Sequence, residues 1–147
     1  HDRVEFVEHL LNDLKSFEYM LANNMFESGI SRIGVEQEFC LVNNEYSPSK
    51  NALKILKLLN DKSFTTELAL YNLELNAEPL KFENSCFRKL ENTLIEKMEK
   101  ARNAAQTLGD KIVITGILPT ISYNEINQEY MTPFKRYKIL GEIIKNA

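Results

Sequence analysis

Two glutamates, Glu36 and Glu38, stand two residues apart in an otherwise apolar run at residues 33–42. Side chains on a β-strand alternate between its two faces, so both carboxylates point to one face while Val35 and Phe39 point to the other. Two like charges on a half-buried face are costly unless a cation with oxygen ligands lies between them. The run therefore predicts a strand over residues 32–42, with one apolar face and one carboxylate face.

A second acidic stretch occupies residues 65–77, as one strand or as a hairpin bent near Tyr71 and ended by Pro79. From residue 72 onward the alternation is regular, and the polar side chains of one face are Asn72, Glu74, Asn76 and Glu78. Glu67 lies earlier in the same stretch. Two strands with carboxylate faces can form one site, and a site with only oxygen ligands suits Mg or Mn better than zinc.

The same alternation also has a simpler interpretation, because carboxylates often mark the solvated face of an antiparallel sheet. A solvated face usually mixes Lys, Thr and Arg with its acids, since like charges opposite each other destabilise a sheet. Neither acidic run contains a Lys or an Arg. The pattern leaves both interpretations open.

Composition limits the other possibilities. With 147 residues, of which 44% are hydrophobic, the chain predicts a single globular domain over residues 1–147. A net charge of −3 provides no basic surface for nucleic acid or for an anionic membrane. We find no apolar run of about 18 residues and no signal peptide, so we expect a cytoplasmic protein.

The histidines and cysteines narrow the chemistry further. His1 and His9 lie at or near the start of the chain, which leaves no Ser-His-Asp or Cys-His arrangement in its body. Cys40 and Cys86 lack the spacing of a metal site, so reduced structural thiols are expected. Cys40 shares the face of the two glutamates, so a role as a ligand or redox group stays open.

Hydrophobic periodicity predicts helices at residues 3–25, 50–60 and 85–108, and a last helix that is capped by Thr132 and runs to the end of the chain. A continuous apolar run at 111–118 predicts a central strand. The fold class is therefore α+β, with an antiparallel sheet and helices packed on one face. Such a small sheet looks unfinished, and further strands from missing chain or a partner would complete it.

Four ordered motifs carry a resemblance to a known family. They are Arg32-Ile33-Gly34-Val35-Glu36-Gln37-Glu38-Phe39, the stretch from Thr66-Glu67-Leu68 to Asn72-Leu73-Glu74-Leu75-Asn76, then Thr115-Gly116-Ile117-Leu118-Pro119-Thr120, and Met131-Thr132-Pro133 followed by Arg136-Tyr137. Together they resemble the amino-terminal part of the glutamate-cysteine ligase type 2 family. The resemblance implies a catalytic core similar to that of glutamine synthetase.

By that resemblance the protein joins the γ-carboxylate of glutamate to an amine such as cysteine, using ATP to form an acyl phosphate, as in glutathione biosynthesis. Mg (or Mn) held by glutamates would offset the negative charge of the phosphoryl groups. The residues implied are Glu36, Glu38 and Glu74 for the metal, Glu67, Asn72 and Tyr137 for substrate binding, and Arg136 as the catalytic contact to a carboxylate or phosphate. The nucleotide contacts are expected from the remaining half of the catalytic domain or another subunit, because no Gly-rich phosphate loop occurs in this chain.

Two alternatives stay open. The chain could be a non-catalytic regulatory domain that binds metal or an amino acid on the same scaffold. It could also be a two-metal phosphohydrolase that uses the same carboxylates, although the shortage of His and of Asp-rich motifs disfavours that class.

Overall fold

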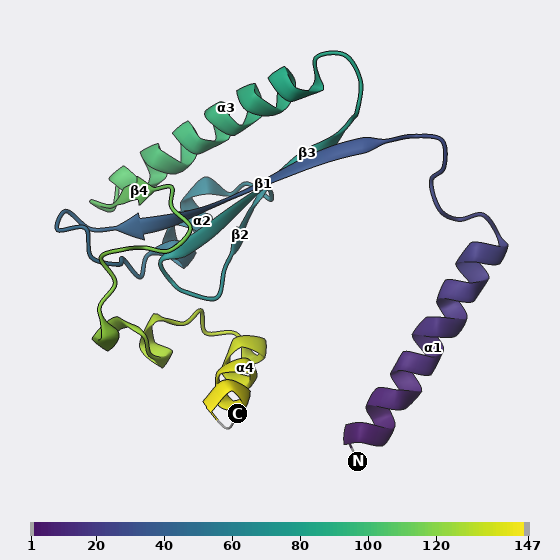
Figure 1. Cartoon of the computed structure of the whole chain (residues 1–147). Coiled ribbons are helices and arrows are strands. Elements are labelled where there is room, and N and C mark those ends of the chain that lie inside the picture. Colours follow the sequence, from purple (N-terminus) through teal and green to yellow (C-terminus); the bar gives the residue numbers. More distant parts are fainter. Residues whose placement is uncertain (1, 146–147) are drawn as a thin grey trace. The chain divides into compact units, whose positions relative to one another are not determined.

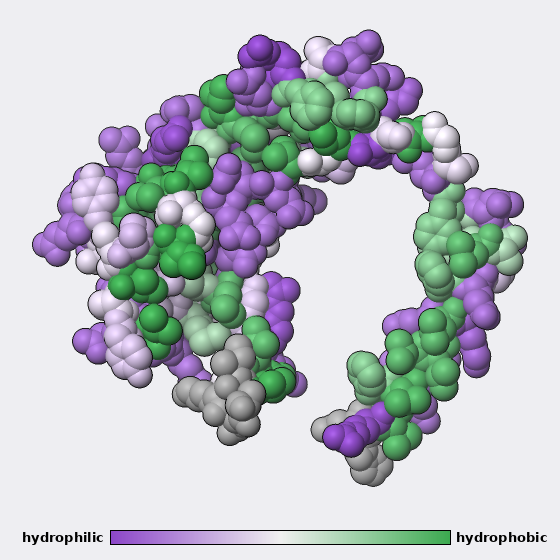
Figure 2. All heavy atoms as spheres, viewed as in Figure 1, coloured by the Kyte–Doolittle hydropathy of each residue, from purple (hydrophilic) through white to green (hydrophobic). Residues whose placement is uncertain are grey.

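The computed structural model describes residues 2–145 and divides the chain into two compact units, His1–Ser31 and Arg32–Ala147. The first unit is mainly one helix, α1 (Asp2–Ala22), as predicted. Its apolar side chains are exposed, including Leu10 at 46% and Leu14 at 52%, and Figure 2 shows them along the helix. Among the described residues, no helix is both long and apolar enough to cross a bilayer.

The second unit contains a four-stranded antiparallel sheet in the order β2-β3-β1-β4. Its long central strands are β1 (Arg32–Val42) and β3 (Asn72–Lys81), and its short edge strands are β2 (Phe64–Thr66) and β4 (Lys111–Val113). The strand expected at 32–42 is confirmed with the same bounds, and the second acidic stretch is a hairpin. The α+β class is confirmed.

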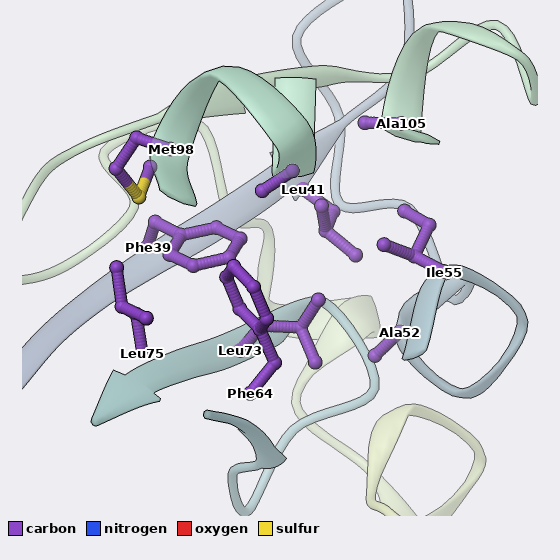
Figure 3. Close-up of a cluster of buried hydrophobic side chains, with 10 residues drawn as sticks. Phe39, Leu41, Ala52, Ile55, Phe64, Leu73, Leu75, Met98 and Ala105 are labelled. Carbon is purple, nitrogen blue, oxygen red and sulfur yellow. The ribbon is translucent and has the colours of Figure 1, made fainter. Parts of the chain in front are cut away.

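Two helices, α2 (Ala52–Leu59) and α3 (Cys86–Gln106), cover one face of this sheet (Figure 1). The core beneath them joins Phe39 and Leu41 of β1 to Leu73 and Leu75 of β3 (Figure 3). All four of these side chains are fully buried. Because β-strand side chains alternate, burying this set turns the glutamates of both strands to the opposite face.

The opposite face is covered only in part. Cys40 and Val42, at the end of β1, are buried there with Leu118, and Tyr71 packs against them. Leu118 belongs to the irregular segment that leads from β4 to the last helix, α4 (Lys135–Lys145). The segment includes two short 3-10 turns, η1 (Tyr123–Glu125) and η2 (Gln128–Tyr130). The remaining part of this face, which bears the glutamates, is the more open one.

Two predictions about strands were wrong. Pro79 does not end the second acidic strand, because β3 continues to Lys81. The pairing of β1 with β3 shifts between Ile33 and Val35, so Pro79 falls at a bulge, where a missing N–H breaks no ladder hydrogen bond. The apolar run at 111–118 is also not central, because only Lys111–Val113 is a strand and it forms an edge.

The role predicted for Thr132 was wrong as well. The last helix begins at Lys135, so Thr132 stands too far upstream to cap it. Thr132 is instead 2% exposed and bonded to the backbone of residues 67 and 68. Thr132, which the sequence pattern predicts as a helix cap, instead connects two segments that are distant along the chain.

Candidate metal and substrate site

Three carboxylates from three places in the sequence meet on the open face of the sheet. Glu38 of β1 and Glu74 of β3 are direct partners across the antiparallel pair, and Glu67 lies just after β2. One oxygen from each of the three lies within 4.8 Å of the other two. A cation with ligand distances of about 2.0–2.6 Å can bridge oxygens up to roughly 5 Å apart, so one ion can contact all three.

The placement of Glu67 depends on its backbone. Its carbonyl oxygen accepts a hydrogen bond from the Thr132 hydroxyl at 2.5 Å, and the Thr132 N–H donates to the Leu68 carbonyl at 2.8 Å. The Leu68 N–H donates to the carboxylate of Glu67 at 3.3 Å. These contacts hold the turn after β2 beside the sheet and so bring a third carboxylate to the pair formed by the strands.

Electrostatics agree with a crowded acidic site. Burial raises the pKa of Glu67, and a side-chain hydrogen bond with Glu74 raises it further. The Asn76 side-chain amide donates to Glu74 and orients it. A bound proton or a cation would relieve the repulsion between these carboxylates. Neither acidic run contains a Lys or an Arg, so the cation would have to come from elsewhere.

Asn72 provides an independent indication that this face binds a ligand. Its side-chain oxygen Oδ1 is buried and has no hydrogen-bond partner within the described chain. Buried polar atoms are nearly always satisfied, because an unmade hydrogen bond costs about 1–3 kcal/mol. Asn72 lies on β3 two residues before Glu74, on the same face. The donor set of three carboxylates fits a hard cation such as Mg or Mn, and the Asn72 oxygen is a further acceptor on the same face.

Glu36 lies outside the group formed by Glu38, Glu67 and Glu74. Its partner across the sheet is Asn76, and it lines a groove of about 620 Å³ together with Lys62 and Glu78. The groove continues the carboxylate face along β1 and β3 in the direction of the bulge. Glu36 thus remains a predicted ligand next to the group rather than a member of it.

Arg136 and Tyr137 lie at the start of α4 and contact each other. Nη2 of Arg136 donates to the Tyr137 hydroxyl at 2.6 Å, and the guanidinium lies 4.5 Å from the centre of the Tyr137 ring. The hydroxyl and ring of Tyr137 therefore orient the Arg136 side chain. Arg136 is exposed, so its remaining donors are accessible to an anionic ligand.

The buried Cys40 lies two residues after Glu38 on β1, and the half-buried Tyr71 packs against the cluster that contains Cys40. Burial raises the pKa of the Cys40 thiol, and the charge of Glu38 adds to that effect. Burial also raises the pKa of Tyr71, with smaller contributions from Cys40 and Glu125. A thiol held protonated is a poor metal ligand or nucleophile, so the environment of Cys40 favours a structural role.

Sequence reasoning singled out all three carboxylates but did not predict that Glu67 lies with the other two. Glu67 was predicted to bind substrate, whereas the structure brings it to Glu38 and Glu74. The role of Thr132 was missed, because a hydrogen bond between residues 65 positions apart leaves no periodic signal. The proximity of Glu67 to Glu74 could have been predicted from the turn expected near Tyr71. A hairpin with that turn brings residue 67 back to the face of residue 74.

Comparison with known protein families gives a match over most of the chain. The model of glutamate-cysteine ligase family 2 matches residues 32–147, which include all three carboxylates and exclude α1. No curated protein and no solved structure matches the chain.

Proposed function

Since the chain belongs to glutamate-cysteine ligase family 2, a family of enzymes that join a carboxylate to an amine, we propose that residues 32–147 form part of the active site of an ATP- and Mg-dependent ligase. The donor in this proposal is the γ-carboxylate of glutamate, and the acceptor is an amine such as cysteine. The product is a γ-glutamyl amide. The observation that carries the proposal is the convergence of Glu38, Glu67 and Glu74 beside the unpartnered oxygen of Asn72.

In this proposal Glu38, Glu67 and Glu74 hold the metal ion. When bound, the ion would offset negative charge on phosphoryl oxygens. The protein's own contribution is to fix the three carboxylates: β1 and β3 present two of them, and Thr132 holds the third in place through the Glu67 backbone. Asn76 keeps Glu74 turned toward the site.

Asn72, Tyr137 and Arg136 are the proposed substrate contacts. The Asn72 oxygen can accept a hydrogen bond from an ammonium or amide group, because it has no partner within the described chain. Arg136 can bind a carboxylate or phosphate through two N–H groups while Tyr137 orients it. We assign no residue of this chain to the nucleotide, and we propose that further chain or another subunit supplies those contacts.

The test is ADP formation by a form of the protein that also contains any chain that follows residue 147. The reaction contains Mg, ATP and glutamate, with and without a panel of amines. ADP that requires glutamate and increases with an amine supports the ligase. Phosphate release that needs neither would instead indicate a phosphohydrolase, and glutamate binding without ADP formation would indicate a regulatory domain.

A further inference from the structure

A second cavity, of about 380 Å³, lies next to the carboxylates and plays no part in holding the metal. One wall is the segment that follows Glu67, including Leu68 and Tyr71. The other wall comes from the irregular segment before α4, including Ile126, Tyr130 and Met131, and Gly141 of α4 closes it. A volume above about 300 Å³ with mainly apolar walls is typical of small-molecule sites.

The two walls are joined by backbone hydrogen bonds, so the cavity has a defined shape. The Leu70 N–H donates to the Tyr130 carbonyl at 2.7 Å, and Ala69 and Met131 form an antiparallel bridge. The rings of Tyr71 and Tyr130 meet edge to face, with centroids 6.5 Å apart. This aromatic pair forms a rigid apolar surface in the lining.

The charged residues in and around the cavity indicate which kind of ligand it can bind. Within the described lining, Glu125 is the only ionisable acid or base apart from the two tyrosines. Its carboxylate is held by the backbone N–H and hydroxyl of Ser122, at 2.7 and 2.8 Å. The neighbouring group of Glu38, Glu67 and Glu74 is also acidic. Outside the lining, the Lys50 ammonium lies 4.6 Å from the centre of the Tyr130 ring, and it pairs with Glu129 at 3.9 Å, which offsets its charge. With an acidic residue in its lining and no Lys or Arg there, the cavity disfavours phosphates and carboxylates and favours a ligand that carries an amine.

We propose that this cavity binds the apolar side chain of the amine acceptor, and that the acceptor is therefore an amine with an apolar or aromatic group larger than the side chain of cysteine. The inference rests on the proposed ligase function. Of the three substrates of such a reaction, ATP and glutamate both carry a net negative charge, whereas the acceptor is an amine that need not carry one. Leu68 connects the cavity to the carboxylates, because its N–H bonds to the Glu67 side chain while its own side chain lines the cavity.

The test uses the chain as it stands and phenethylamine as the probe, with binding followed by NMR titration. The controls are 3-phenylpropionate, which replaces the amine by a carboxylate, and adenosine, which tests for a nucleoside site. We expect shifts confined to residues 68–71, 125–131 and 141, and at least tenfold weaker binding of 3-phenylpropionate. Equal binding of the acid, stronger binding of adenosine at this cavity, or no shift there would overturn the proposal.

Gly141 allows a matched pair of variants. A Cβ at this position meets only the Met131 side chain, at 3.6 Å, which is ordinary contact. Gly141→Ala should therefore leave phenethylamine binding within about twofold, whereas the longer side chain of Gly141→Leu should fill the cavity and weaken binding at least tenfold. Glu125→Gln keeps an acceptor for the Ser122 contacts, so a loss of amine affinity there reports charge rather than folding. Unchanged binding in both Gly141→Leu and Glu125→Gln would contradict the proposal.

Mn binding to the carboxylates, measured on the same samples, separates this inference from the proposed function. Normal Mn binding without amine binding removes only the cavity proposal. Amine binding at the cavity without Mn binding removes the ligase site and leaves the cavity as an amine site.

Discussion

Glu38 and Glu74 face each other directly across the antiparallel pair of β1 and β3. Like charges at paired positions destabilise a sheet by a few tenths of a kcal/mol to about 1 kcal/mol. The fold keeps this pair and adds Glu67 to it through the Thr132 hydrogen bond. Carboxylates that converge on one point at a cost in stability are typical of a binding site. The predictions below follow from this arrangement.

Thr132 is expected to control the position of Glu67. Thr132→Val removes the hydroxyl but keeps the shape, so the Glu67 carbonyl loses its partner. We expect a loss of about 1–2 kcal/mol in the free energy of unfolding and weaker Mn binding. Urea denaturation and Mn titration measure the two effects. Thr132→Ser keeps the hydroxyl and should restore Mn binding, and a Ser variant as weak as the Val variant would contradict this role.

Asp61 is expected to stabilise the fold in a pH-dependent way. Its carboxylate accepts hydrogen bonds from Lys97 at 2.6 Å and from the Ser63 hydroxyl at 2.7 Å, and these contacts hold the pKa of Asp61 well below its usual range. A lowered pKa means stability that is fully present above the unfolded pKa of about 4 and is lost as the pH falls below it.

Asp61→Asn should therefore lower the free energy of unfolding by about 1–2 kcal/mol at pH 7, and the difference from the parent protein should shrink as the pH falls below about 4. Urea denaturation at several pH values measures it. Lys100→Gln is the control, because Lys100 lies farther from Asp61, at 3.6 Å, and is more exposed. A pH-independent difference for Asp61→Asn would show that the carboxylate charge is not responsible.

Substitutions in the core beneath β1 and β3 should lower the stability of the fold much more than substitutions at exposed positions. Leu75 is fully buried between the sheet and the helices. Leu75→Ala should cost about 2–4 kcal/mol in the free energy of unfolding, while Ile117→Ala, at a position 83% exposed, should change it by less than about 0.5 kcal/mol. Chemical denaturation tests both. Comparable effects of the two substitutions would contradict the packing described for this face.

Glu36 offers a test of how far the proposed metal site extends along β1. It lies outside the group of Glu38, Glu67 and Glu74 and pairs with Asn76. Glu36→Gln should therefore weaken Mn binding less than Glu38→Gln does. Equal losses in the two variants would extend the site along β1 to include Glu36.

The face of each strand could be predicted from sequence because alternation is local. Residues 33–42 and 72–78 show it in their own side chains, and burial in the structure follows the same alternation up to the end of β1, where both faces are covered. Strand order and strand ends could not be predicted in this way. The run at 111–118 is as apolar as a central strand, yet Ile114 and Ile117 are exposed and the strand stops at Val113.

The same distinction between local pattern and tertiary structure applies to the candidate site. Glu38 and Glu74 follow from the pattern of two strands. Their direct pairing depends on the register of β1 with β3, and the bulge at Pro79 shows that a register is set by tertiary structure rather than by periodicity. The approach of Glu67 depends on a hydrogen bond from a buried threonine far along the chain.

Mn binding by the chain and its charge-neutral variants tests the central claim most directly. We expect one Mn site in residues 32–147, and Glu38→Gln and Glu74→Gln should each weaken it at least about tenfold while the protein stays folded. Glu78→Gln is the matched control, because Glu78 lies on the same face of β3 but outside the group of three carboxylates. This variant should bind Mn like the parent protein. Parent-like Mn binding by Glu38→Gln and Glu74→Gln, or an equal loss in Glu78→Gln, would contradict a metal site at these carboxylates.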